Sequence, residues 1–306
     1  MRIRETLADG VANGGSLRAA AGSPRRIDRV VAAVGIATGL WVSAAGAPQS
    51  ASDAPPGQGG GRTLLDAQRA FYNARYDEAA AQALELRSAD PDDLAAYELR
   101  TSALHFQIKA ALGGERDRSK ALKQCEECRE WMDAFLSDTA AGRTLARAKL
   151  AADPEDDVAL FFLGKLDLNY VWLQLGTLGR RTGWDEYWEA RRSLDAVLKR
   201  QPEHVRARVA RGWIDYIVDT RMPRGTRWIL GGGNKKRALA TIREAAATEA
   251  DFFIKAEAMF ALWDLHVREQ NLAEAVTLAQ GLARDFPENR ELVKFLDAQQ
   301  NRALQP

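Results

Sequence analysis

Apolar residues recur at three- and four-residue intervals from about Thr63 to the end of the chain, with Ala, Leu, Glu, Arg and Lys between them. This spacing is typical of amphipathic helices, and no stretch keeps the two-residue alternation of a half-buried strand. The residues between the apolar positions are strong helix formers. The pattern therefore predicts an all-α body over residues 63–306.

Proline marks the predicted helix ends. Because proline has no N–H and clashes with the preceding turn, it ends one helix and can occupy the first turn of the next. Four such stops occur, at Ala89-Asp90-Pro91, Ala152-Asp153-Pro154, Arg200-Gln201-Pro202 and Asp285-Phe286-Pro287.

Small residues lie at fixed distances from these prolines. Alanine stands twelve residues before a proline at Ala79, Ala190 and Ala275, and glycine stands ten residues after one at Gly164 and Gly212. A Glu precedes each of these alanines, and a Tyr or Leu stands three residues before it. Small side chains at such places let two antiparallel helices approach closely. The offsets predict helix pairs, each closed by a proline.

These shared offsets resemble those of the tetratricopeptide repeat (TPR), a helix pair of about 34 residues. The closing prolines lie 63, 48 and 85 residues apart, so the units carry insertions, and one unit has Ala250 where its proline would fall. The resemblance covers residues 63–303 and implies about five degenerate helical-hairpin repeats plus a closing helix from Glu288 to Ala303, stacked into a right-handed superhelix. A non-repeating helical bundle is the alternative.

Residues 1–47 have the order of a secretory signal peptide. Six Arg and three acidic residues come first, an uncharged run at 30–42 follows them, and small residues follow that run. An uncleaved anchor is the alternative, because the uncharged run extends to Ala47, just long enough to cross a bilayer. Residues 48–62 are rich in Gly, Pro and Ser and predict a flexible linker. We therefore expect an exported protein, periplasmic or otherwise in the cell envelope, that is attached to a membrane only through a retained leader.

Composition narrows the possible partners. The 306 residues are 46% hydrophobic, enough for a folded core of one large or two ordinary domains and too much for disorder. The 43 basic and 42 acidic side chains give a net charge of +1, so no global field attracts nucleic acid or an anionic membrane. We expect no nucleic-acid partner.

The two cysteines, Cys125 and Cys128, are the first chemical candidates. Arg129 follows the pair where a c-type haem site needs His, and His105 is the only plausible further zinc ligand. A thioredoxin-like pair needs its first Cys at a helix N-terminus, whereas residues 121–124 already read as helix. A reduced, packed pair or a local disulfide is favoured, and the disulfide would require a bent or broken helix.

The three histidines, His105, His204 and His266, fall in different units without a second His or Glu at a ligand spacing. Surface or groove positions are expected for them. No Ser or Cys lies on a nucleophile elbow and no pair of carboxylates stands out, so the sequence predicts no catalytic residue, metal or cofactor. A hydrolase or redox enzyme would depend on the two cysteines alone.

Two insertions, at residues 175–184 and 219–236, each connect the first helix of a unit to the second. Stacking would place both on the same rim, where Trp beside Arg indicates a peptide or anion contact. Residues 231–234 precede a helix whose backbone N–H groups can hold an anion, with a flexible linker and an Asn cap as the alternative. The basic rim residues are Arg180, Arg181, Trp184, Arg221, Arg224, Arg227, Trp228, Lys235 and Lys236.

The TPR resemblance also implies a concave groove lined by first-helix residues at fixed offsets from the marker glycines Gly164 and Gly212. The offsets select Val158, Phe161, Lys165, Leu168, Asn169, Arg206, Val209, Trp213, Tyr216 and Ile217. Phe161, Leu168 and Val209 are expected to pack between units. The groove and partner-binding residues are then Lys165, Asn169, Arg206, Trp213 and Tyr216.

The sequence thus predicts a non-catalytic, exported TPR-like scaffold that holds a protein or peptide in its groove, with the basic rim clamping an acidic or C-terminal group. The alternative is a small-solute or organic-anion binder of an envelope transport system. The turn Leu230-Gly231-Gly232-Gly233 resembles those of TPR-type accessory subunits of tripartite solute transporters.

Overall fold

The computed structural model describes residues 63–180 and 182–303. Every regular element in these two ranges is a helix and none is a strand, which confirms the all-α prediction. The predicted leader and linker, residues 1–62, lie outside the described residues, as does Arg181.

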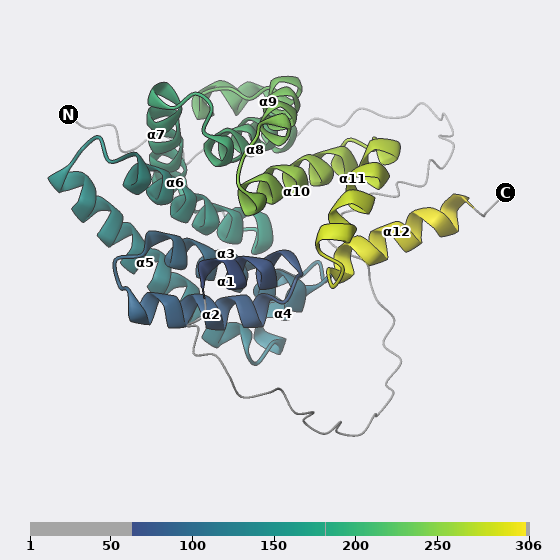
Figure 1. Ribbon diagram of the computed structural model, residues 1–306, viewed down its shortest axis with the longest axis horizontal. Helices are drawn as coiled ribbons and strands as arrows, with labels where there is room; N and C mark the ends of the chain where they lie inside the picture. The colour runs from purple at the N-terminus through teal and green to yellow at the C-terminus, as the bar shows by residue number, and fades with distance from the viewer. Residues whose placement is uncertain (1–62, 181, 304–306) are drawn as a thin grey trace, which may run out of the picture. The chain divides into compact units, whose positions relative to one another are not determined.

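The described helices follow one another along the chain as labelled in Figure 1. They are α1 (Leu64–Tyr72), α2 (Tyr76–Ala89), α3 (Leu94–Leu112), α4 (Arg118–Gln124), α5 (Cys128–Ala152), α6 (Asp157–Val171), α7 (Trp184–Arg200), α8 (Val205–Arg221), α9 (Lys235–Ala247), α10 (Phe252–Arg268), α11 (Leu272–Asp285) and α12 (Arg290–Ala303). A π-helix, η1 (Trp172–Thr177), continues α6, and a 3-10 helix, η2 (Arg224–Leu230), lies between α8 and α9.

The proline turns end helices where the sequence predicts. Helices α2, α5, α7 and α11 each end two residues before a proline. The proline itself does not enter the next helix, contrary to the expectation that it could occupy the first turn. A capping side chain stands two residues after each proline and accepts first-turn backbone N–H groups, so the helix begins only after the cap. These caps are Asp93, Asp156, His204 and Asn289.

The two marker glycines lie where helices approach most closely. A Cβ on Gly164 of α6 would lie 3.0 Å from Leu194 and 3.3 Å from the Ala190 carbonyl of α7. A Cβ on Gly212 of α8 would lie 2.8 Å from Ile242 of α9. Glycine at these positions therefore allows the close helix pairing that the sequence predicts.

Successive helices pack on one another along the described chain, and some contacts skip a helix. Helix α3 packs on α1 and α6, and α10 packs on α8 and α1. Tyr72 at the end of α1 stacks on Phe253 and Phe260 of α10, with ring centroids 5.9 and 5.4 Å apart. In the turn before α12, Asn289 Nδ2 donates to the Tyr72 carbonyl at 2.7 Å. The first described helix is thus tied to late parts of the chain.

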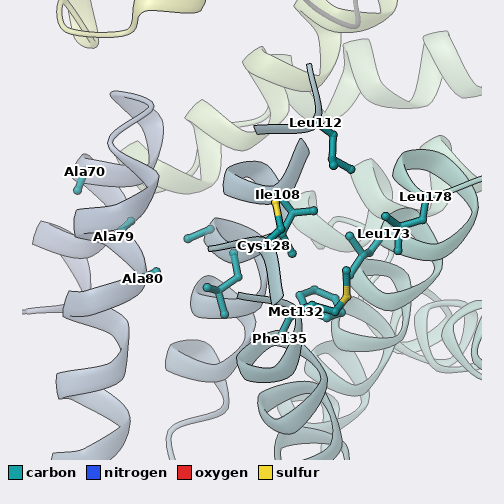
Figure 2. Close-up of a cluster of buried hydrophobic side chains, with 12 residues drawn as sticks. Ala70, Ala79, Ala80, Ile108, Leu112, Cys128, Met132, Phe135, Leu173 and Leu178 are labelled. Atoms are coloured by element: carbon teal, nitrogen blue, oxygen red, sulfur yellow. The ribbon is translucent and has the colours of Figure 1, made fainter. Parts of the chain in front are cut away.

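One core lies between α3, α5 and η1, and Figure 2 shows Ile108, Met132, Phe135 and Leu173 grouped there around Cys128. Cys128 forms a disulfide with Cys125. Helix α4 ends before Cys125 and α5 begins at Cys128, so the helix is broken at the pair. Of the two states that the sequence favoured, the structure has the disulfide, together with the helix break that it required.

One helical segment, Asp157–Thr177, is long and apolar enough to cross a membrane by length and composition. It comprises α6 and η1, and 67% of its most apolar stretch is buried in the protein. Helices α3, α5 and α7 pack around α6. This burial is the environment of a core helix.

Candidate functional site

Three of the predicted groove residues lie together at the centre of the helix packing. Lys165 on α6 and Arg206 on α8 meet two carboxylates that the sequence analysis did not select, Glu98 on α3 and Glu257 on α10. We call these four residues the central charge cluster. Because each comes from a different helix, the cluster joins α3, α6, α8 and α10.

The cluster pairs each cation with both carboxylates. Lys165 Nζ lies 2.7 Å from Glu257 Oε1 and 3.5 Å from Glu98 Oε1. Arg206 Nη2 lies 3.0 Å from Glu98 Oε2, and Arg206 Nε donates to Glu257. The two positive and two negative charges balance, as the burial of ions requires.

Burial and pairing oppose each other at these groups. Burial acts to lower the pKa of Arg206, but the charges of Glu257 and Glu98 raise it above its usual value. Burial likewise acts to raise the pKa of Glu257, but Arg206 and Lys165 hold it well below the ordinary range. The Arg206 guanidinium also lies 4.9 Å from the Phe161 ring centroid, a favourable cation–π distance. Arg206 and Glu257 therefore stay ionised.

Asn169, the third groove residue here, extends the cluster into a buried polar layer. Its Nδ2 donates to Thr101 Oγ1 at 2.9 Å and to Ser102 Oγ at 3.0 Å. Ser102 Oγ in turn donates to Glu98 Oε1 at 3.1 Å. The side-chain nitrogen of Asn169 is thus engaged by the chain itself, and a ligand reaching Lys165 or Arg206 would have to displace Glu98 or Glu257.

The remaining groove residues, Trp213 and Tyr216, lie further along α8 and contact the end of α10. Tyr216 donates through its hydroxyl to Glu269 Oε1 at 2.9 Å, and the Arg268 guanidinium lies 5.4 Å from the Trp213 ring centroid. Burial, followed by this hydrogen bond, raises the pKa of Tyr216. Glu269 also pairs with Lys235 at 2.6 Å. The predicted groove set is therefore divided between two places.

The second insertion is folded back on α8 by one carboxylate. Asp219 binds the Arg227 guanidinium and accepts the backbone N–H of Lys235 at 2.9 Å. Gly233 lies so close to α8 that a Cβ there would be 2.6 Å from the Asp219 nitrogen and 2.7 Å from the Asp215 carbonyl. Packing alone therefore requires glycine in this part of the Leu230–Gly233 turn.

The second insertion is also held by α7. Tyr187 donates to the Leu230 carbonyl at 2.8 Å, and Arg191 donates to the Leu230 and Gly231 carbonyls at 2.9 Å each. The first insertion leads directly into α7 at Trp184. The two insertions are thus connected through the first turns of α7.

The second insertion also presents two exposed large apolar side chains. Trp228 is 76% exposed and Ile229 is 53% exposed, at the end of η2. Trp228 donates through its indole N–H to the Gly225 carbonyl at 2.9 Å. The same insertion carries exposed basic side chains at Arg221, Arg224 and Lys236. We call the basic-aromatic patch the set Arg221, Arg224, Trp228, Ile229 and Lys236.

The other rim residues differ in their surroundings. Arg227 and Lys235 pair with Asp219 and Glu269. Arg180 donates to Gln174 Oε1 at 3.4 Å, and Trp184 is 41% exposed. Arg181 lies outside the described residues.

Two histidines lie where the sequence analysis did not expect them. His105 and His266 are buried rather than at the surface. His105 Nε2 is 2.8 Å from Thr177 Oγ1, and burial lowers its pKa to about 3, so it stays neutral. His204 caps α8 through Nδ1. Nowhere in residues 63–180 and 182–303 do three His, Cys, Asp or Glu side chains converge as a metal site would need.

No protein-family model, curated protein or solved structure matches this chain.

Proposed function

We propose that this protein is an exported, TPR-like helical-repeat scaffold that binds a protein or peptide partner and has no catalytic role. The repeat assignment is supported by the recurring proline and cap turns and by the close pairing at Gly164 and Gly212. Helix contacts between neighbours and next-but-one neighbours are those that stacked helix pairs make, whereas the contact of α1 with α10 is additional to such a stack. The Cys125–Cys128 disulfide supports an oxidising compartment outside the cytoplasm.

The observation that carries the binding proposal is the basic-aromatic patch. Trp and Arg dominate the energy of protein interfaces, and here Trp228, which is 76% exposed and hydrogen-bonded through its indole N–H, adjoins Ile229 in an insertion that carries exposed basic side chains. The charge of Arg221, Arg224 and Lys236 is complementary to an acidic segment or a chain-terminal carboxylate. The partner therefore presents an acidic group next to an apolar side chain.

The patch, rather than the central charge cluster, is the proposed first contact. Lys165 and Arg206 already pair with Glu98 and Glu257. Removing either carboxylate from them would leave a buried charge without its partner, at a cost of about 3–5 kcal/mol. The exposed patch needs no such rearrangement.

Site-specific photo-crosslinking in envelope extract tests the proposal. A photoreactive side chain at Ile229 should capture a discrete partner, whereas the same group at Leu136, an exposed position on α5, should not. The captured segment, made as a synthetic peptide, should contain acidic residues. It should bind at least about tenfold more weakly to Trp228→Ala and to Arg224→Glu.

Equal capture from both positions would contradict the proposal. So would unchanged peptide affinity in both variants, or binding of the patch to anionic lipid vesicles in place of a peptide.

A further inference from the structure

A second set of charged side chains lies where α5, α6 and α7 meet. Arg143 and Arg147 come from α5, Asp167 from α6, and Glu186 and Glu189 from α7; we call these five the acid–arginine cluster. Arg143 Nε is 2.7 Å from Asp167 Oδ1, while its other two nitrogens lie 3.1 Å from Glu186 and 3.2 Å from Glu189. Arg147 Nη2 is 2.5 Å from Glu189.

The charges in this cluster do not balance, since three carboxyl groups share two guanidinium groups. Asp185 and Arg192, which line the same hollow, add one charge of each sign and leave the imbalance unchanged. Asp167 is the most deeply placed, with 0% of its surface exposed. Neither of its oxygens accepts a hydrogen bond, because Arg143 Nε approaches it without hydrogen-bond geometry. A carboxylate in that position would be buried without full compensation.

A proton on Asp167 removes this imbalance. Burial raises the pKa of Asp167 to about 8, with Glu189 adding to the effect and Arg143 opposing it. At Glu189 burial also acts to raise the pKa, but hydrogen bonds from Arg147 and Arg143 lower it overall. Protonated Asp167 can then donate to the Glu189 carboxylate. Helix α3, which also packs on α6, contributes Tyr97 beside Leu166 and pairs its Arg100 with Asp138 of α5.

The same turns of α7 also hold the basic-aromatic patch in place. Glu186 and Glu189 face α5, whereas Tyr187 and Arg191 bind the Leu230 and Gly231 carbonyls at the end of η2. Trp228 and Ile229 directly precede this anchor. Movement of the start of α7 would therefore be transmitted to the patch.

We propose that the proton held between Asp167 and Glu189 latches the first turns of α7 onto α5, and that loss of this proton releases α7 together with the basic-aromatic patch. The role of the latch in regulating the basic-aromatic patch rests on the proposed function. The latch itself does not need a partner. With the proton gone, Asp167 repels Glu189 and competes with Glu186 and Glu189 for Arg143.

The direction of the pH effect follows from linkage. The closed state keeps the proton up to about pH 8, whereas in the open state a hydrated Asp167 loses it near pH 4. Opening therefore releases a proton between these values, so it becomes easier as pH rises. The equilibrium constant for opening rises by at most about tenfold per pH unit and stops rising above about pH 8. The latch holds in acid and weakens toward neutral and alkaline pH.

Hydrogen exchange followed by mass spectrometry measures this opening directly. In the full chain, protection of residues 184–191 and 224–231, corrected for intrinsic exchange rates, should fall at least about tenfold between pH 5.5 and pH 7.5. Asp167→Asn keeps an uncharged side chain of the same shape and should abolish the fall. Glu130→Gln, which removes an exposed carboxylate of α5 outside the acid–arginine cluster, should keep it.

A second variant keeps the test informative if Asp167→Asn does not fold. Glu189→Gln removes the acceptor charge that helps to hold the proton, so the pH range of the fall should end at a lower pH than in the unchanged protein. Equal protection at both pH values in the unchanged protein would overturn the inference. So would a fall that persists in Asp167→Asn, or one confined to residues 184–191 without residues 224–231.

These results are independent of the proposed partner. If the peptide identified by crosslinking does not bind, the exchange data still establish or refute the latch. If the latch is absent, the peptide affinity still tests the patch.

Discussion

Removing one cation from the central charge cluster should be far more damaging than removing an arginine of the same helix whose carboxylate partner is exposed. Arg206→Met keeps most of the side-chain volume but leaves Glu98 and Glu257 buried with Lys165 as their only counter-charge. It also removes the cation–π contact with Phe161 at 4.9 Å. Loss of one partner from a buried ion pair costs about 3–5 kcal/mol, and we expect the free energy of unfolding to fall by that amount.

Two comparisons isolate the charge effect. Arg208→Met changes the next basic residue of α8. Arg208 is 17% exposed, against 16% for Arg206, but its partner Glu203 is 75% exposed, so the substitution should cost no more than about 1 kcal/mol. The double variant Arg206→Met with Glu257→Gln leaves Lys165 opposite Glu98 and restores neutrality. It should recover about 1–3 kcal/mol relative to Arg206→Met alone.

Urea unfolding followed by far-UV circular dichroism measures all three variants. A cost of Arg206→Met no greater than that of Arg208→Met would show that the buried carboxylates do not depend on this cation. A further loss of stability on neutralising Glu257 in the Arg206→Met background would show the same.

Three further predictions concern separate features of the fold. Gly212→Ala should lower the free energy of unfolding by about 1–3 kcal/mol, because its Cβ would lie 2.8 Å from Ile242, whereas Gly225→Ala, in open space, should change it by less than about 0.5 kcal/mol. The pKa of His105 is about 3 in the folded protein, so the unfolded chain takes up the proton first as pH falls below about 6.5. The free energy of unfolding should therefore fall by up to about 1.4 kcal/mol per pH unit below that value. This fall should be smaller in His105→Gln when urea unfolding at pH 7 and pH 5 is compared. Reduction of the Cys125 disulfide should lower the thermal midpoint by the equivalent of about 2 kcal/mol, and an unchanged midpoint would show that the bond does not restrict the unfolded chain.

The helix ends could be predicted because proline acts locally. The residue before the helix was harder to assign, although its signal is in the sequence. Asp93, Asp156, His204 and Asn289 all stand two residues after a proline, and Asp and Asn are strong capping residues. Attention to this position would have placed all four helix starts three residues after the proline.

The sequence predicted the two cations of the central charge cluster but not its two carboxylates, because the groove offsets were counted from the marker glycines. Helix α3 has Thr101 where α6 and α8 have their marker glycines, so Glu98 was not selected. Counted from the helix cap, Glu98 occupies the same position as Phe161. When the same offsets are counted from the start of α10, Glu257 lies one residue away from the nearest groove position. Only the packing of α10 on α8 brings it to Arg206. No local pattern reports such a contact.

The basic-aromatic patch could be predicted from the sequence because Trp and Arg are conspicuous in a Gly-rich connection. Its anchoring was not, since the Leu230 and Gly231 carbonyls are backbone groups that any residue would supply. The buried state of His105 likewise depends on η1, where the chain continues α6 as a π-helix that brings Thr177 to the imidazole.

The tie between the first described helix and the turn before α12 changes how this chain should gain and lose its structure. Arrays of helix pairs whose ends are separate fray from the termini and melt in steps. Here Tyr72 and Asn289 are joined across 217 positions of sequence, so neither end can loosen without breaking contacts at the other. Denaturation should therefore be a single cooperative transition. During synthesis the amino-terminal helices must wait for almost the whole chain before they gain their final contacts.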